Sequence, residues 1–206
     1  LPELPEVETT ARSLRPRVVG RRIVSVDGVD WPRMLPNTTE AELQSTLIGR
    51  QVSGIERRGK YLLVELEGDT WVSFHRKMSG NLLLEPAEAP RALHTHIAIG
   101  LDDGSELRFV DARKFGRVHL FHSSLELTDF LAERLGPDSL NDLDPAALAK
   151  RLHGRKARIK SLLLDQAFLA GVGNLYADEA LWEARLHPLR SADSLSAREV
   201  KKLATA

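Results

Sequence analysis

The pattern of apolar residues changes near residue 124 of this 206-residue chain, and that change limits the folds open to it. Before it, short alternating segments are separated by turn residues, which is typical of strands with one buried face. After it, apolar residues recur at helical spacing behind residues that favour helix starts. The sequence predicts an α+β protein with an N-terminal domain at residues 1–123 and a helical domain at residues 124–206.

The first domain is predicted to hold an N-terminal helix and an antiparallel β-sandwich. Pro5 suits the first turn of that helix, and Pro16 is expected to stop it. A short helix is expected at residues 41–47. The expected strands are residues 23–29, 51–55, 61–66, 71–75, 81–84, 97–101, 106–111 and 116–121.

The second domain is predicted to be a series of helices. The first is expected to end at Gly136-Pro137, and the third to cover residues 156–164. The last reaches Ala206 without a stop signal, so we expect the sequence to be cut off inside a helix. The expected N-caps, in chain order, are Thr128, Asp144, Asn174 and Ser196.

Composition excludes several classes of protein. The chain has no cysteine, which excludes disulfides and any cysteine-ligated zinc within it. It has no apolar run long enough to span a bilayer, and acids occupy its first residues where a signal peptide would be apolar. We therefore expect a cytoplasmic protein.

The net charge is zero, but the charges are unevenly distributed. Such segregation is compatible with a basic face for a phosphate backbone, but on charge alone solvated helix and strand faces are the more common explanation. The basic clusters are Arg12, Arg15, Arg17, Arg21 and Arg22; Arg57, Arg58 and Lys60; Arg113, Lys114 and Arg117; and Lys150, Arg151, Arg155, Lys156, Arg158 and Lys160.

The opening run, Leu1-Pro2-Glu3-Leu4-Pro5-Glu6-Val7-Glu8-Thr9-Thr10, resembles the start of formamidopyrimidine-DNA glycosylases. In that family the initiator residue is removed and proline becomes the N-terminus. The resemblance implies that Pro2 is the catalytic nucleophile and Glu3 its acid–base partner. A terminal amine has a pKa of about 7.7–8, so much of it is unprotonated near neutral pH and can attack the sugar carbon C1′. On its own, a proline here would more often be a helix-start residue.

Leu1 departs from the family, which begins with methionine. A retained leucine would block the Pro2 nitrogen as an amide. We expect that a leucine-type start codon was translated literally, and that the cell initiates with methionine and removes it.

Three further stretches carry the resemblance. Arg57-Arg58-Gly59-Lys60-Tyr61-Leu62-Leu63 places Lys60 where the family has an active-site lysine. Lys77-Met78-Ser79-Gly80 and Asp111-Ala112-Arg113-Lys114-Phe115-Gly116 place Met78, Arg113 and Phe115 where the family fills the gap left by a flipped nucleotide. Taken alone, Met78 and Phe115 would more often be core residues, and Lys60 a solvated one.

The run from Ala170 to Glu179, with Ile159-Lys160 and Leu164-Asp165-Gln166 before it, resembles the family's helix–two-turn–helix. Gly171 and Gly173 allow close approach of backbone to a phosphate, and the next helix begins with free N–H groups. The resemblance implies that Lys160 and Asn174 contact the phosphate at the lesion.

The pair His94 and His96 suggests a metal site, but no third or fourth ligand has convincing spacing. We predict no metal in this chain and expect His94 to face DNA. The family normally continues into a C-terminal zinc finger with four cysteines, which this sequence does not contain.

The resemblance implies a monomeric, nucleoid-associated bacterial repair enzyme without an organic cofactor. Its expected activity is that of a DNA-formamidopyrimidine glycosylase and abasic-site lyase, which removes 8-oxoguanine and formamidopyrimidines from duplex DNA and cuts the strand by β,δ-elimination. Phe115 and Leu4-Pro5 favour this branch over endonuclease VIII-like enzymes for oxidised pyrimidines. A non-catalytic damaged-DNA-binding module and a ribosomal RNA binder remain alternatives.

Overall fold

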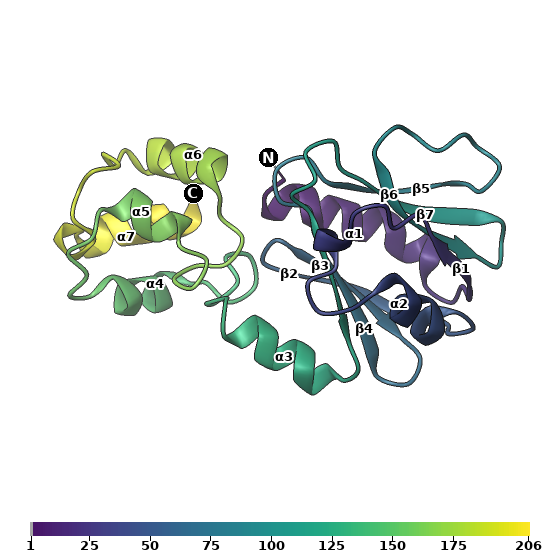
Figure 1. Cartoon of the computed structure of the whole chain (residues 1–206). Helices are drawn as coiled ribbons and strands as arrows, with labels where there is room; N and C mark the ends of the chain where they lie inside the picture. Colours follow the sequence, from purple (N-terminus) through teal and green to yellow (C-terminus); the bar gives the residue numbers. More distant parts are fainter. Residues whose placement is uncertain (1) are drawn as a thin grey trace. The chain divides into compact units, whose positions relative to one another are not determined.

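The computed structural model describes residues 2–206, so Leu1 and the expectation attached to it lie outside the described part of the chain. The chain forms two compact units, Leu1–Thr128 and Asp129–Ala206, which are described separately (Figure 1). Helix α3 (Ser124–Ala132) runs across this division. The domain boundary inferred from the sequence, at residue 123, therefore remains a prediction.

The first unit opens with α1 (Leu4–Val18). Its apolar side chains at helical spacing are all buried: Leu4, Val7, Ala11, Leu14 and Val18. The prediction that Pro16 stops this helix is wrong, because the helix continues through it for two more residues. Proline lacks one backbone N–H, and here the loss falls in the last turn, where burial of Val18 holds the helix together.

Two four-stranded antiparallel sheets follow, which confirms the predicted sandwich. The first has the order β1 (Ile23–Asp27), β6 (Thr95–Leu101), β7 (Ser105–Val110), β5 (Asn81–Pro86). The second has the order β2 (Val52–Arg58), β3 (Tyr61–Leu66), β4 (Thr70–His75), β8 (Arg117–Phe121). A 3-10 turn, η1 (Pro32–Met34), and the expected short helix, α2 (Glu40–Leu47), lie between β1 and β2.

The core of this unit draws on α1, α2 and both sheets. Phe109 of β7 is fully buried, and its ring centroid lies 5.9 Å from that of Phe74 in β4. Since β7 and β4 belong to different sheets, this ring pair joins the two layers.

Two chain connections cross from one sheet to the other at the same end of the sandwich. Residues 76–80 lead from β4 to β5, and residues 111–116 lead from β7 to β8. Because β4 pairs with β8 and β5 with β7, the two connections run side by side. Gly80 and Gly116 let the two connections pass close over the Phe109 ring. A Cβ on Gly80 would lie 2.8 Å from that ring, and a Cβ on Gly116 would lie 2.5 Å from it.

The second unit is helical and has its own core. Beyond α3 it contains α4 (Pro145–Leu152), α5 (Ile159–Leu164), α6 (Asn174–Ala184), the 3-10 turn η2 (Ala192–Ser194) and α7 (Ala197–Thr205). Two of the predicted N-caps are confirmed: Asp144 accepts from the Ala147 N–H at 2.7 Å, and Ser196 forms a capping box with Glu199.

Other predictions for the helical unit are wrong. Helix α3 starts behind Ser123, whose Oγ accepts from the Glu126 N–H at 3.2 Å, so Thr128 lies inside the helix. This helix ends at Ala132, before Gly136, and α5 begins at Ile159, three residues later than expected. Gly173 is the N-cap of α6, so Asn174 is its first helical residue. None of the helices within residues 2–206 has the length and apolar character needed to cross a membrane.

Phe109→Ala should lower the free energy of unfolding of the first unit by about 3–5 kcal/mol, because it leaves a cavity between the sheets. Urea denaturation followed by the fluorescence of buried Trp71 measures the loss. Leu125→Ala, at a side chain that is 67% exposed, is the control and should change the free energy by less than about 0.5 kcal/mol. Equal losses in the two variants would contradict the assignment of Phe109 to the joint between the sheets.

Candidate functional site

The start of α1 brings together the three residues predicted to be catalytic. Glu3 directly follows Pro2, is only 2% exposed and is the N-cap of the helix. Its own N–H donates to the Glu6 carboxylate at 2.9 Å. Lys60 lies close enough for the negative charge of Glu3 to raise its pKa, although burial has the larger effect and lowers the pKa overall. A half-buried proline, a buried carboxylate and a desolvated ammonium group therefore share one site.

Local structure explains why Lys60 lies there. It occupies a two-residue turn between β2 and β3, and Gly59 before it has a φ of 55°, which favours glycine. Arg57 of β2 fixes this hairpin to α1 through its ion pair with Glu8, at 2.8 Å. The Arg57 side chain is buried, so this pair is shielded from water and holds the turn at the start of the helix.

His75 completes this site and was missed from the sequence, where it is simply the end of an expected strand. Its ring packs edge-on against Tyr61 with centroids 4.6 Å apart, and its Nδ1 accepts from the Lys77 N–H at 3.0 Å. Burial first, and then the charges of Lys77 and Lys60, lower the pKa of His75 to about 3. The ring is therefore neutral, and its proton is on Nε2. A neutral N–H donor beside lysines is suited to an anionic oxygen.

Arg76, the next residue, was also missed. Its guanidinium links the helix to the turn at residues 76–80, and no local pattern in the sequence could have indicated this. The acceptors are the Glu6 carbonyl at 3.2 Å, Thr10 Oγ1 at 2.9 Å, the Gly80 carbonyl at 2.8 Å and Asn81 Oδ1 at 2.7 Å.

The predicted gap-filling residues lie on the two connections that run side by side. Met78 is 40% exposed and Phe115 is 43% exposed, although both are large and apolar. The Arg113 guanidinium lies 4.9 Å from the centroid of the Phe115 ring. Neither apolar side chain is buried, which is the arrangement expected of residues that contact a partner.

The two histidines near these turns differ from each other. His96 is buried and lies between the Asp30 carboxylate at 2.6 Å and the Asp111 carbonyl at 2.9 Å. His94 is exposed and has a φ of 69°. Within residues 2–206 there is no group of three or more His, Cys, Asp or Glu side chains that could hold a metal ion. With no cysteine in the chain, the residues present do not fit the family's zinc finger.

In the second unit, the predicted phosphate-binding residues lie on neighbouring helices. Lys160 in α5 forms an ion pair with Asp178 of α6, with Nζ and Oδ1 2.6 Å apart. Asn174 is exposed in the first turn of α6. The loop before α6 is held by Gln166, whose side chain accepts from the Gly171 N–H at 3.0 Å and donates to the Val172 carbonyl at 2.8 Å. Gly171 has a φ of 107°, which only glycine readily adopts.

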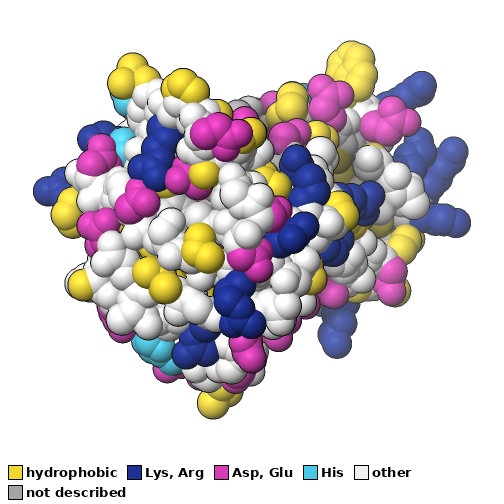
Figure 2. All heavy atoms as spheres, turned by 90° about the vertical axis from the view of Figure 1, so that its right-hand side faces the viewer, with side chains coloured by type: hydrophobic (Ala, Val, Ile, Leu, Met, Phe, Trp, Pro, Cys, Tyr) yellow, Lys and Arg dark blue, Asp and Glu magenta, His cyan; other side chains and the backbone are white. Residues whose placement is uncertain are grey.

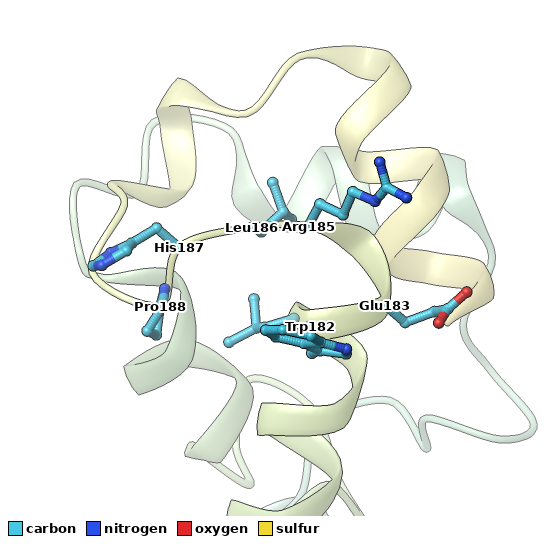
Figure 3. Close-up of a pocket in the computed structure, with 7 residues that line it drawn as sticks. Trp182, Glu183, Arg185, Leu186, His187 and Pro188 are labelled. Atoms are coloured by element: carbon cyan, nitrogen blue, oxygen red, sulfur yellow. The ribbon is translucent and has the colours of Figure 1, made fainter.

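The same unit has a surface hollow of about 660 Å³ at the end of α6 (Figure 3). Trp182, Arg185, Leu186, His187 and Pro188 are among its lining residues. None of the predicted site residues lines it, so it is not the place where the predicted chemistry converges.

Some side chains of the basic clusters found in the sequence are paired with acids, among them Arg57 with Glu8 and Lys160 with Asp178. Arg12, Arg21 and Arg22 form ion pairs with acids, at 2.8, 3.1 and 3.8 Å. On the face shown in Figure 2, Lys and Arg side chains lie beside Asp and Glu side chains. The charge pattern alone therefore does not define a DNA-binding face.

Comparison with known proteins identifies the family. Residues 1–118 match the formamidopyrimidine-DNA glycosylase N-terminal domain, and residues 135–206 match the formamidopyrimidine-DNA glycosylase H2TH domain. The chain belongs to the formamidopyrimidine-DNA glycosylase family. The structure also confirms the predicted α+β fold with a helix–two-turn–helix domain.

Individual relatives agree with this assignment. The chain is 48% identical to a formamidopyrimidine-DNA glycosylase of Roseiflexus sp. (strain RS-1) and 46% identical to one of Chloroflexus aurantiacus. It covers 74% and 72% of those proteins, while 98% of its own length is matched. It also resembles the Lactococcus lactis enzyme in complex with abasic-site DNA, with 36% identity, a TM-score of 0.91, and coverage of 99% of this chain and 74% of that one.

We expect NMR to show His75 neutral, with its proton on Nε2, at about pH 5, where an ordinary histidine is charged. Lys77→Met should raise the pKa of His75 from about 3, because it removes a nearby positive charge. The pKa of His75 is lower in the folded chain than its value of 6.5 in the unfolded chain. The contribution of His75 to the free energy of unfolding is therefore fully present above pH 6.5 and is lost as the pH falls toward 3. An imidazolium at about pH 5 would refute this account.

Proposed function

We propose that this chain is a bifunctional DNA glycosylase and abasic-site lyase of base-excision repair that acts on oxidised purines in duplex DNA. The observation that carries the proposal is the buried Glu3 carboxylate directly after Pro2, with the desolvated Lys60 beside it. Relatives named formamidopyrimidine-DNA glycosylase, and the Lactococcus lactis enzyme bound to DNA containing Fapy-dG, support the substrate class.

In the proposed reaction, the Pro2 nitrogen attacks C1′ of the damaged nucleotide and the base leaves with the electron pair of the glycosidic bond. Glu3 transfers the protons that the departing base and the opening sugar require. The resulting iminium acidifies the neighbouring sugar C–H bonds, so the 3′ phosphate and then the 5′ phosphate are eliminated. The nitrogen must be a free amine, so the reaction belongs to a chain that begins at Pro2.

The surrounding residues bind the DNA in this proposal. Lys60 and the Nε2–H of His75 face a phosphate next to the lesion. Met78 and Phe115 fill the gap left by the flipped nucleotide, and Arg113 donates to the orphaned partner base. His94 lies on the DNA side of the same unit.

The helical unit is proposed as the DNA-binding domain, with Lys160 and Asn174 on the phosphate backbone. The ion pair of Lys160 with Asp178 does not prevent this, since an ammonium group has three donors. We propose the bacterial cytoplasm, at the nucleoid, as the place of action, with the protein working as a monomer.

Borohydride should trap a covalent adduct between protein that begins at Pro2 and a duplex carrying 8-oxoguanine opposite cytosine. Pro2→Gly should weaken or abolish the adduct, because the rigid secondary amine is lost. Pro5→Ala is a matched control, since it changes a proline in the first turn of α1 and leaves the terminal amine. Lesion binding without any adduct would instead favour a non-catalytic module.

A panel of lesion duplexes should show faster base release from 8-oxoguanine and formamidopyrimidines than from thymine glycol and dihydrothymine. The reason is the exposed Phe115 on a turn typical of the purine-specific branch. Single-turnover rates of base release measure the preference. Faster release of the pyrimidine lesions would assign an endonuclease VIII-like activity.

A further inference from the structure

The two turns that carry the proposed gap-filling residues are joined by one hydrogen bond between side chains, from Ser79 Oγ–H to Asp111 Oδ1. We propose that this bond fastens the turns into one unit, so that Met78, Arg113 and Phe115 enter the DNA together. The inference rests on the function proposed above. Ser79 and Asp111 are positioning residues in it, because they act through their neighbours and need not touch DNA.

The Asp111 carboxylate is the centre of the second turn as well. It is 1% exposed, and it accepts from the Arg113 N–H at 3.2 Å and from the Gly116 N–H at 2.7 Å. Its backbone carbonyl also accepts from the Lys114 N–H at 3.2 Å. One buried carboxylate therefore shapes residues 111–116 and holds residues 77–80 through Ser79.

Asp111 is in turn fixed to the sheet, so it can serve as a rigid support for the two turns. Its N–H donates to the His94 carbonyl at 3.0 Å, and its carbonyl accepts from His96 Nε2 at 2.9 Å. Since Asp111 and His96 are both buried, water does not compete for these bonds.

Both turns need such a fastening, because their backbones are strained and their tips are exposed. Lys77 has a φ of 52° and Lys114 a φ of 58°, values that residues other than glycine rarely adopt. Each of these lysines lies next to a gap-filling residue, Met78 or Arg113 and Phe115. A conformation of this kind persists only where surrounding contacts hold it.

The test compares Ser79→Ala with Ser105→Ala in the full chain beginning at Pro2. Ser105 makes the same kind of bond, to Asp103 at 2.6 Å, in an exposed turn of the same unit. Hydrogen exchange of residues 77–80 should become about tenfold faster in Ser79→Ala, the factor expected when a hydrogen bond to a charged group is lost. Ser105→Ala should leave that segment unchanged. An unchanged rate in Ser79→Ala would overturn the proposal.

Borohydride trapping provides the functional readout. Ser79→Ala should slow trapping on the 8-oxoguanine duplex about tenfold, by the same factor, and leave trapping on a single-stranded abasic oligonucleotide unchanged, since that DNA has no gap to fill. In a Phe115→Ala background, Ser79→Ala should cause no further loss, because the two residues act together. Equal losses on both DNAs, or additive losses, would contradict a positioning role.

The proposed function and the proposed fastening of the turns can each fail without the other. If the unsubstituted chain traps neither DNA, the proposed function fails, while the exchange rates of residues 77–80 still decide whether Ser79 and Asp111 fasten the turns. If the chain traps both DNAs and exchange is unchanged in Ser79→Ala, the function stands and the fastening is wrong.

Discussion

The guanidinium of Arg76 is the group on which the geometry of the first unit's site depends. It donates to the Glu6 carbonyl and Thr10 Oγ1 in α1. It also donates to the Gly80 carbonyl and Asn81 Oδ1, at the end of the connection from β4 to β5. The helix that directly follows Pro2 and Glu3 is thereby tied to the turn that carries Met78. Burial lowers the pKa of Arg76, but an arginine starts so high that the group stays charged and keeps all its donors.

Three short links therefore hold together the residues proposed to react and those proposed to fill the gap in the DNA. Arg57 and Glu8 hold the Lys60 turn to α1, Arg76 holds the Met78 turn to α1, and Asp111 joins that turn to Phe115. All three use charged groups that are at least partly shielded from water, where such bonds are strong and leaving one unmade is costly. A reaction on an extruded nucleotide needs this rigidity, since the amine and the gap-filling side chains must act on the same base pair.

The sequence predicted the architecture well because alternation, turn residues and caps are local signals. The bounds of β3 and the caps at Asp144 and Ser196 agree with the structure. The prediction for Pro16 was wrong because the hydrogen bond that proline cannot donate is lost in the last turn, where burial of Val18 outweighs the loss. Thr128 and Asn174 were misread because a neighbouring residue, Ser123 or Gly173, takes the cap position.

The site was predictable only where the resemblance supplied it. His75 packs against Tyr61, and Arg76 donates to the Glu6 carbonyl 70 positions away; only the folded chain brings these residues together. Family membership is established by the matched domains, while the roles of Pro2, Glu3 and Lys60 remain proposals supported by their proximity.

Mass spectrometry of the peptide that carries DNA after borohydride trapping and digestion identifies the nucleophile directly. If Pro2 is the nucleophile, the sugar remnant is bonded to the N-terminal nitrogen of the peptide beginning Pro2-Glu3-Leu4. A remnant on Lys60, or on any other lysine, would contradict the assignment of Pro2 as the nucleophile.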